Sequence, residues 1–178
     1  MTSILGTQSI QHPNGTASAT VLADGTFSSP GHVIQTVQQA YTTATSISST
    51  SYTATGLSAS ITPKFSSSKI LVLVNLSAET FQYGQVAGKF FLQILRDISG
   101  GSETEIAFRR SDSYAATASN GYYSFSVHGT MNYLDSPNTT NALTYTVKGK
   151  TSHTTNSFTL RLHDVSSLST LTLQEIAQ

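Results

Sequence analysis

Alternation of apolar and polar residues with a period of two is the strongest structural signal in this sequence. Successive side chains of a β-strand point to opposite faces of a sheet, so this period predicts strands with one buried face. Between residues 122 and 133, one face would carry Tyr123, Phe125, Val127, Met131 and Tyr133, and the other Tyr122, Ser124, Ser126 and His128. Further inward-facing sets are Leu143, Tyr145 and Val147, then Phe158, Leu160 and Leu162, and finally Leu171 and Leu173. Turn residues such as Gly100-Gly101 separate these segments, which is typical of antiparallel strands.

Two continuous apolar runs of strand length lie in the middle of the chain. Lys69–Leu76 is expected to be buried on both faces, and Gly88–Arg96 is expected to be a second core strand. The best helix candidate, Ile34–Ala40, is short and rich in β-branched residues, so a strand is favoured there as well. About eight or nine strands favour an all-β, antiparallel two-sheet sandwich of the jelly-roll kind. An immunoglobulin-like sandwich is the alternative, although the Cys and Trp residues of antibody domains are missing.

The first third of the chain has a different pattern. Residues 1–31 contain two hairpin-type dipeptides, Asn14-Gly15 and Asp24-Gly25, which flank a weak strand pattern of small residues. This segment has too little apolar surface to fold alone, so we expect an extended N-terminal arm or small β-element, residues 1–31, before a sandwich domain, residues 32–178. Small polar residues dominate residues 41–60, which we interpret as a loop region.

Charge and composition exclude several classes of function. Nine Lys and Arg residues balance nine Asp and Glu residues, and charged residues make up 10% of the 178 residues. Such a chain lacks the basic surface of a general nucleic-acid binder. Without cysteine it has no disulfide scaffold and no thiolate ligand. The sequence contains no run of about 18 apolar residues, so we expect no membrane-spanning helix. The N-terminus lacks the pattern of a signal peptide, so we expect none. Hydroxyl groups rather than charges form the polar surface, which suits assembly with neighbouring proteins.

Residues with catalytic or metal-binding potential are few, and we expect no enzymatic activity, no catalytic residue, no metal and no cofactor. His163-Asp164 is interpreted as an exposed pair at a strand end. The five histidines are far apart, so a zinc site would need three of them to converge by folding or around the axis of a trimer. Glu103 and Glu105 are expected to share one strand face with Arg109 as a surface charge cluster.

Several segments resemble one group of proteins. They are Ser9–Phe27, Pro30–Val37, Thr55–Pro63, Ser66–Val74 and Leu171–Ala177. These segments resemble structural proteins of tailed-bacteriophage virions, often described as tail-fibre-like, which are common in marine and cyanobacterial phages. The resemblance covers most of the chain and weakens around residues 97–120. It rests on strand and turn sequences and implies no catalytic residues.

Two virion roles follow from the resemblance. A capsid decoration (cement) protein binds the major capsid protein on the capsid surface, usually as a homotrimer, and clamps adjacent capsomers with an arm. A tail or head fibre would instead recognise a host surface glycan, and Tyr114, Tyr122 and Tyr123 around a turn-rich tip leave glycan binding open. The short chain favours decoration, with neither nucleic acid nor membrane as partner. The expected contact residues lie in loop region 41–60 and in the arm, where they are Ile4, Leu5, Ile10, His12, Pro13, Asn14, Val21, Leu22 and Phe27.

Overall fold

The computed structural model describes residues 9–15, 17–23, 25–83, 87–114, 121–154, 158–163 and 167–178. In these residues every regular element is a strand, as the period-two pattern predicts. No helix there is long and apolar enough to cross a membrane. The strands are β1 (Ser9–Gln11), β2 (Ala17–Val21), β3 (Phe27–Ser28), β4 (Val33–Tyr41), β5 (Thr45–Ile47), β6 (Thr53–Ile61), β7 (Lys69–Tyr83), β8 (Ala87–Ile98), β9 (Thr104–Tyr114), β10 (Tyr122–Asp135), β11 (Leu143–Thr151), β12 (Thr159–Leu162) and β13 (Ser169–Ile176).

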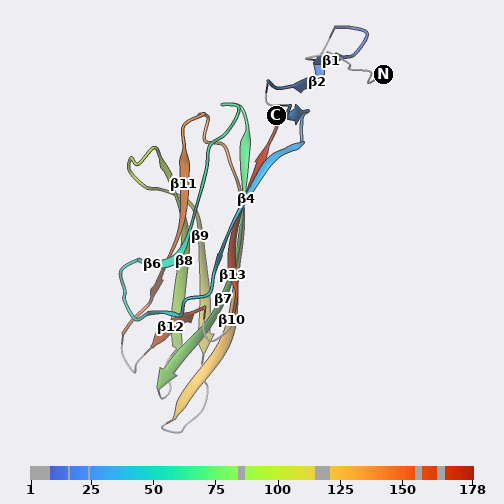
Figure 1. The fold of residues 1–178 in the computed structure, drawn as a ribbon. Coiled ribbons are helices and arrows are strands. Elements are labelled where there is room, and N and C mark those ends of the chain that lie inside the picture. Colours follow the sequence, from blue (N-terminus) through green and yellow to red (C-terminus); the bar gives the residue numbers. More distant parts are fainter. Residues whose placement is uncertain are drawn as a thin grey trace.

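Two sheets lie face to face and form an elongated sandwich (Figure 1). One edge of β7 pairs first with β13 and then with β12, and these two strands pair in turn with β4 and β5. β4 and β5 therefore follow one another as a single interrupted long strand, and β12 and β13 form a second one. Counted in this way, the sandwich has eight long strands. The first sheet then has the order β4/β5, β13/β12, β7, β10, and the second has the order β6, β11, β8, β9.

The pairing of these eight long strands is nested. The first pairs with the last (β4 with β13), and the innermost pair is β8 with β9. Between them, β6 pairs with β11 and β7 with β10. This order is that of a long hairpin rolled into two antiparallel sheets, which defines a jelly roll. The jelly-roll prediction is confirmed.

The core fills the space between the two inner faces. β11 and β13 alternate strictly between buried and half-buried residues, and the inward sets predicted for both strands are buried. The prediction for β7 is wrong in one respect. Val72 and Val74 are buried, but Leu71 and Leu73 on the opposite face are only half-buried, because that face is an outer face of the sandwich. A continuous apolar run here encodes one buried face and one partly exposed apolar face.

The interpretation of residues 41–60 as a loop is also wrong. The segment contains β5 and β6, and β6 buries every second residue from Thr55 to Ile61. Its exposed hydroxyls pair across the sheet, Ser58 with Thr146 (3.3 Å) and Ser60 with Thr144 (2.9 Å between the oxygens). Small residues concealed the alternation, because Thr and Ala at buried positions are only weakly apolar.

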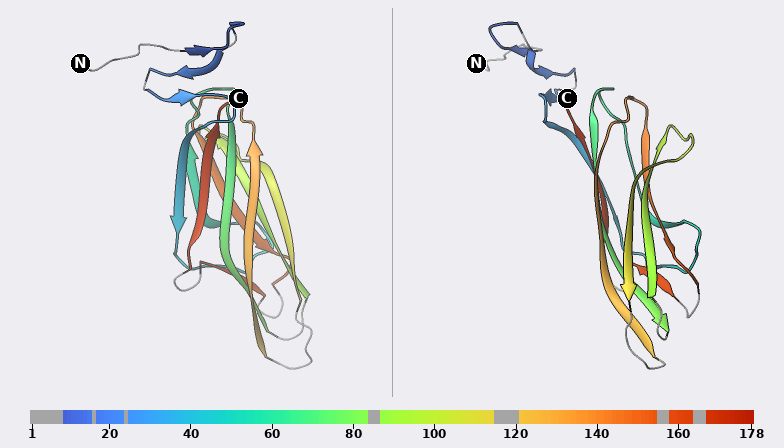
Figure 2. Two further views of the ribbon diagram at one scale, coloured as in Figure 1. Left: turned by 90° about the vertical axis from the view of Figure 1, so that its right-hand side faces the viewer. Right: turned by 180° about the vertical axis from the view of Figure 1, so that it is seen from behind.

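A separate small sheet of β1, β2 and β3 precedes the sandwich. Gly15 and Gly25 adopt positive φ angles of 85° and 81° in the two connecting turns, as the hairpin dipeptides predict. The small sheet lies beyond the end of the sandwich at which the C-terminus lies (Figure 2). We call the described part of it, residues 9–28, the arm sheet.

Candidate interface site at the arm end of the sandwich

Backbone pairing holds the turn between the arm sheet and β4 against the end of β13. After β13, the amide of Ala177 donates to the carbonyl of His32 (2.9 Å), and the amide of Gly31 donates to the carbonyl of Ala177 (2.8 Å). Gly31 has a φ of +80°, a conformation that glycine adopts without strain. The Phe27 and His32 rings meet edge to face, with 5.7 Å between the centroids. The chain therefore leaves the arm sheet through a defined turn.

A buried carboxylate organises the loop on which the arm sheet rests. Glu175 is fully buried and lies on the inner face of β13. One of its oxygens accepts hydrogen bonds from the amides of Lys64 (2.8 Å) and Phe65 (3.3 Å), and the other accepts one from the Gln35 side chain (2.6 Å). A buried charge needs such donors. The ammonium of Lys64 then reaches Thr26 in the arm segment, at 3.2 Å.

Glu175 was not among the predicted site residues, although the sequence contains a signal for it. Counting every second residue from Leu171 and Leu173 places Glu175 on the buried face. A charged residue in an inward register is rare unless it is paired or hydrogen-bonded. That conflict marks a position with a specific structural role.

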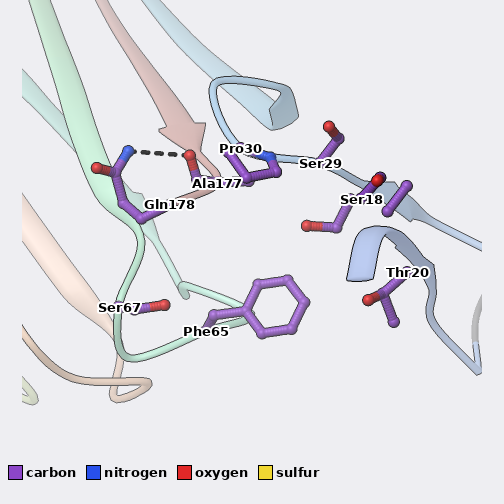
Figure 3. A pocket seen from close by; sticks show the side chains of 10 residues that line it. Ser18, Thr20, Ser29, Pro30, Phe65, Ser67, Ala177 and Gln178 are labelled. Atoms are coloured by element: carbon purple, nitrogen blue, oxygen red, sulfur yellow. Dashed lines mark hydrogen bonds between the residues drawn. The ribbon is translucent and has the colours of Figure 1, made fainter. Parts of the chain in front are cut away.

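A cavity of about 190 Å³ lies between the arm sheet and the sandwich (Figure 3). Its walls come from β2, from the turn before β4, from the loop between β6 and β7, and from the C-terminus. The Phe65 ring points into this space, and the surrounding side chains are mainly hydroxyls, including Ser18, Thr20 and Ser67. The side chains that line it carry no formal charge.

The predicted contact residues of the arm occupy different environments. Ile4 and Leu5 lie outside the described residues. Ile10 is 51% exposed and Phe27 is 42% exposed. His12, Pro13 and Asn14 are exposed in the first turn, whereas Val21 and Leu22 are half-buried. The role of these residues in binding stays a prediction.

The interpretation of His163 as an exposed strand-end residue is wrong, and Asp164 lies outside the described residues. His163 is fully buried. Its Nε2 lies 2.8 Å from the carbonyl oxygen of Thr55, and its Nδ1 lies 2.6 Å from the hydroxyl of Ser169. A carbonyl only accepts, so Nε2 carries the proton and Nδ1 accepts from Ser169. Burial lowers the pKa of His163, although its bond to Thr55 opposes this shift. A serine beside a histidine resembles part of a catalytic triad, but here both residues are sealed in the core.

A second buried polar network lies between the sheets. The Arg96 guanidinium contacts both carboxylate oxygens of Asp135, at 2.8 and 2.9 Å. The Tyr145 hydroxyl donates to the same carboxylate at 2.8 Å. Burial, followed by the bond to Asp135, raises the pKa of Tyr145 well above its usual range. The network joins β8, β10 and β11 and has a structural role.

The expected charge cluster of Glu103, Glu105 and Arg109 does not form. A β-bulge opposite Ile94 and Leu95 shifts the register of β9, so Glu105 pairs with outward-facing Leu95 and Arg109 with inward-facing Leu92. Glu103 instead forms an ion pair with Lys148 at 2.5 Å. In the described part of the chain, no three His, Asp or Glu side chains converge as metal ligands.

Comparison with known proteins adds two distant structural similarities. No protein-family model matches the chain, and no curated protein is detectably similar. The fold is similar to a chain in the structure of infectious bursal disease virus Gt strain (12% identity, 88% of this chain, 42% of that chain, TM-score 0.35). For the Gx strain the values are 12% identity, 88%, 40% and 0.27. This chain spans less than half the length of either viral chain.

Proposed function

We propose that the chain is a structural protein of a tailed-phage virion, a decoration protein that binds the major capsid protein on the capsid surface. The proposal rests on the resemblance of its strand and turn sequences to virion proteins. The structural observation that carries it is the arm sheet, which is fixed to one end of a jelly roll and presents Ile10 and Phe27 to solvent.

The chemistry of the arm suits a clamp on a protein lattice. Residues 1–31 contain a single formally charged side chain, Asp24. When a partner covers the exposed apolar residues of this nearly uncharged arm, their burial stabilises the complex. A protein that binds only the assembled lattice stabilises that lattice by mass action. Because few ion pairs would form, binding should depend weakly on salt.

Capsids that lack this protein provide the test. The variant Ile10→Asp/Phe27→Asp should lose capsid binding in co-sedimentation, because two charges enter the apolar contact surface. The control is Leu168→Asp, which adds a charge at a residue that is 54% exposed outside the arm. Circular dichroism should show the same fold for all three proteins. Wild-type occupancy of capsids by the arm variant would refute the clamp.

One observation favours the alternative, a fibre or receptor-binding protein that recognises a host glycan. On the outer face of the second sheet, the rings of Phe91 and Phe108 stack with 6.0 Å between centroids. The ammonium of Lys150 lies over the rings of Phe91 (5.2 Å) and Tyr52 (4.5 Å). Phe108 is 52% exposed. Aromatic faces with neighbouring polar groups can stack on sugar rings.

Glycan binding and decoration predict different measurements. If these aromatic rings on the second sheet bind a glycan, Phe108→Ala should abolish binding to host polysaccharide. Phe125→Ala, at another exposed aromatic residue, should not. Copy number separates the roles further: hundreds of copies per virion indicate decoration, and a few dozen or fewer indicate a fibre.

A further inference from the structure

β10 is a long edge strand with an unpaired side. It pairs with β7 over fourteen consecutive residues without a bulge, and no other described strand pairs with it. From Tyr122 to Leu134 it contains no Asp, Glu, Lys, Arg or Pro. Exposed strand edges bind other strands, and proteins normally block them with bulges, charges, proline or very short strands.

Every other edge strand of the sandwich has such a block. β9 contains a bulge and four charged residues, and β4 has an irregular register near its start. β6 has an irregular register around Gly56, whose φ is +93°. β5 contains only three residues. β10 alone, among the described edge strands, is long, regular and uncharged.

Exposed apolar side chains gather along the same strand. Phe125 and Tyr133 are each 39% exposed, although their registers opposite Thr80 and Val72 face inward. Leu134, on the outer face, is 48% exposed. Phe125 lies in the half of β10 from Tyr122 to His128, whereas Tyr133 and Leu134 lie beyond it. A single exposed apolar residue is ordinary, but on an unblocked edge it adds apolar surface that a paired strand would cover.

One side chain fixes the direction of the backbone groups of β10. Arg109 donates to the carbonyl oxygen of Thr130. That carbonyl therefore points away from β7, and because direction alternates along a strand, so do the backbone groups of Ser124, Ser126 and His128. Among the described residues, Arg109 bonds to the backbone of β10 at Thr130, and no described strand pairs with the outward groups of the half from Tyr122 to His128.

We propose that this half of β10 pairs antiparallel with the same half in a second copy of the chain. A second copy fits because an antiparallel edge is its own complement across a twofold axis. Two uncharged strands also meet without repulsion. The two four-stranded first sheets then form one continuous sheet across the dimer. This twofold arrangement differs from the trimer that the sequence resemblance implies, and it does not depend on binding to a capsid.

Sedimentation of the purified full chain tests the dimer. Wild-type protein should form a dimer at tens of micromolar, and Ser124→Lys/Ser126→Lys should weaken association at least tenfold, because charges on the edge repel across the twofold axis. The matched control is Ser58→Lys/Ser60→Lys, with the same substitutions and spacing on the exposed face of edge strand β6. Its association should equal that of wild type. Both variants must show the circular dichroism spectrum of wild type, so that a change in association does not reflect unfolding.

Amide hydrogen exchange provides an independent measurement. In the dimer, the amide of His128 should exchange at least tenfold more slowly than in the lysine variant, in which residue 128 is unchanged. Three outcomes would overturn the proposal: a wild-type monomer at hundreds of micromolar, a trimer, or association of the β10 variant equal to that of wild type.

Discussion

The two lateral sides of the sandwich are closed to different degrees. On the side where β4 faces β6, the Gln35 side chain donates to the carbonyl of Thr62 (2.7 Å), His163 bonds to Thr55, and the Tyr41 ring covers Gly56. On the side where β9 faces β10, the described cross-sheet hydrogen bond runs from Arg109 to Thr130. We call the β4/β6 side, where several side chains bridge the sheets, the closed side. We call the β9/β10 side, where the edge of β10 stays largely uncovered, the open side. Under the proposed dimer, the closed side would serve folding and the open side would serve assembly.

The largest effect is expected on the closed side, at Gly56. A Cβ at this position would lie 2.4 Å from the Tyr41 ring, and its φ of +93° is unfavourable for any other residue. Gly56→Ala should lower the free energy of unfolding by about 3 kcal/mol or more, because backbone strain and overpacking add together. Urea denaturation measures this change.

Gly100→Ala is the matched control for that substitution. Gly100 has a similar φ of +75°, but a Cβ added there would have no atom within 4 Å. Its cost should be limited to backbone strain, about 1 kcal/mol. Equal losses for the two variants would show that Tyr41 moves away freely, and the closed side would then be less rigid than its contacts imply.

The next effect concerns Glu175, at the arm end of the closed side. Glu175→Gln replaces an acceptor for three N–H donors with an amide that has only one oxygen. Loss of charge-assisted hydrogen bonds should cost about 2 kcal/mol. Hydrogen exchange should show faster exchange at the amides of Lys64 and Phe65 than in wild type. Unchanged protection of both amides would contradict the role of Glu175 in holding this loop.

The sequence predicted the strands of the sandwich other than β5 and β6, because their alternation reflects burial directly. Leu171, Leu173 and Tyr145 face inward as their spacing requires. It predicted single residues poorly where the backbone departs from a regular strand. His163 has a φ of +56°, so the chain turns its ring inward just after β12. The bulge in β9 likewise reverses the face of Arg109 relative to Glu105. Such departures depend on tertiary packing and are not encoded by periodicity.

A smaller, pH-dependent effect is expected from His163. Its pKa in the folded chain lies below the ordinary value of about 6.5 that it has in the unfolded chain. As pH falls below about 6.5, the unfolded state binds more protons than the folded state. The free energy of unfolding should therefore fall, by at most about 1.4 kcal/mol per pH unit. The loss ends once the pH is below the folded pKa. His163→Asn should remove this slope, whereas His128→Asn, at an exposed histidine, should retain it.

The smallest effect on stability, and the sharpest test of the two sides, is expected at Arg109. Arg109→Ala removes the cross-sheet hydrogen bond of the open side, and because that bond is exposed its loss should cost only about 0.5 kcal/mol. The same substitution frees the carbonyl of Thr130, so the edge available to a second copy grows by one acceptor. Dimer association should strengthen about threefold, which corresponds to roughly 0.6 kcal/mol. Arg110→Ala is the control, because Arg110 pairs with Asp112 and donates no described bond to β10. A loss of stability at Arg109 as large as that at Glu175 would mean that the open side is held as firmly as the closed side, since a side used for assembly should tolerate removal of this hydrogen bond between β9 and β10.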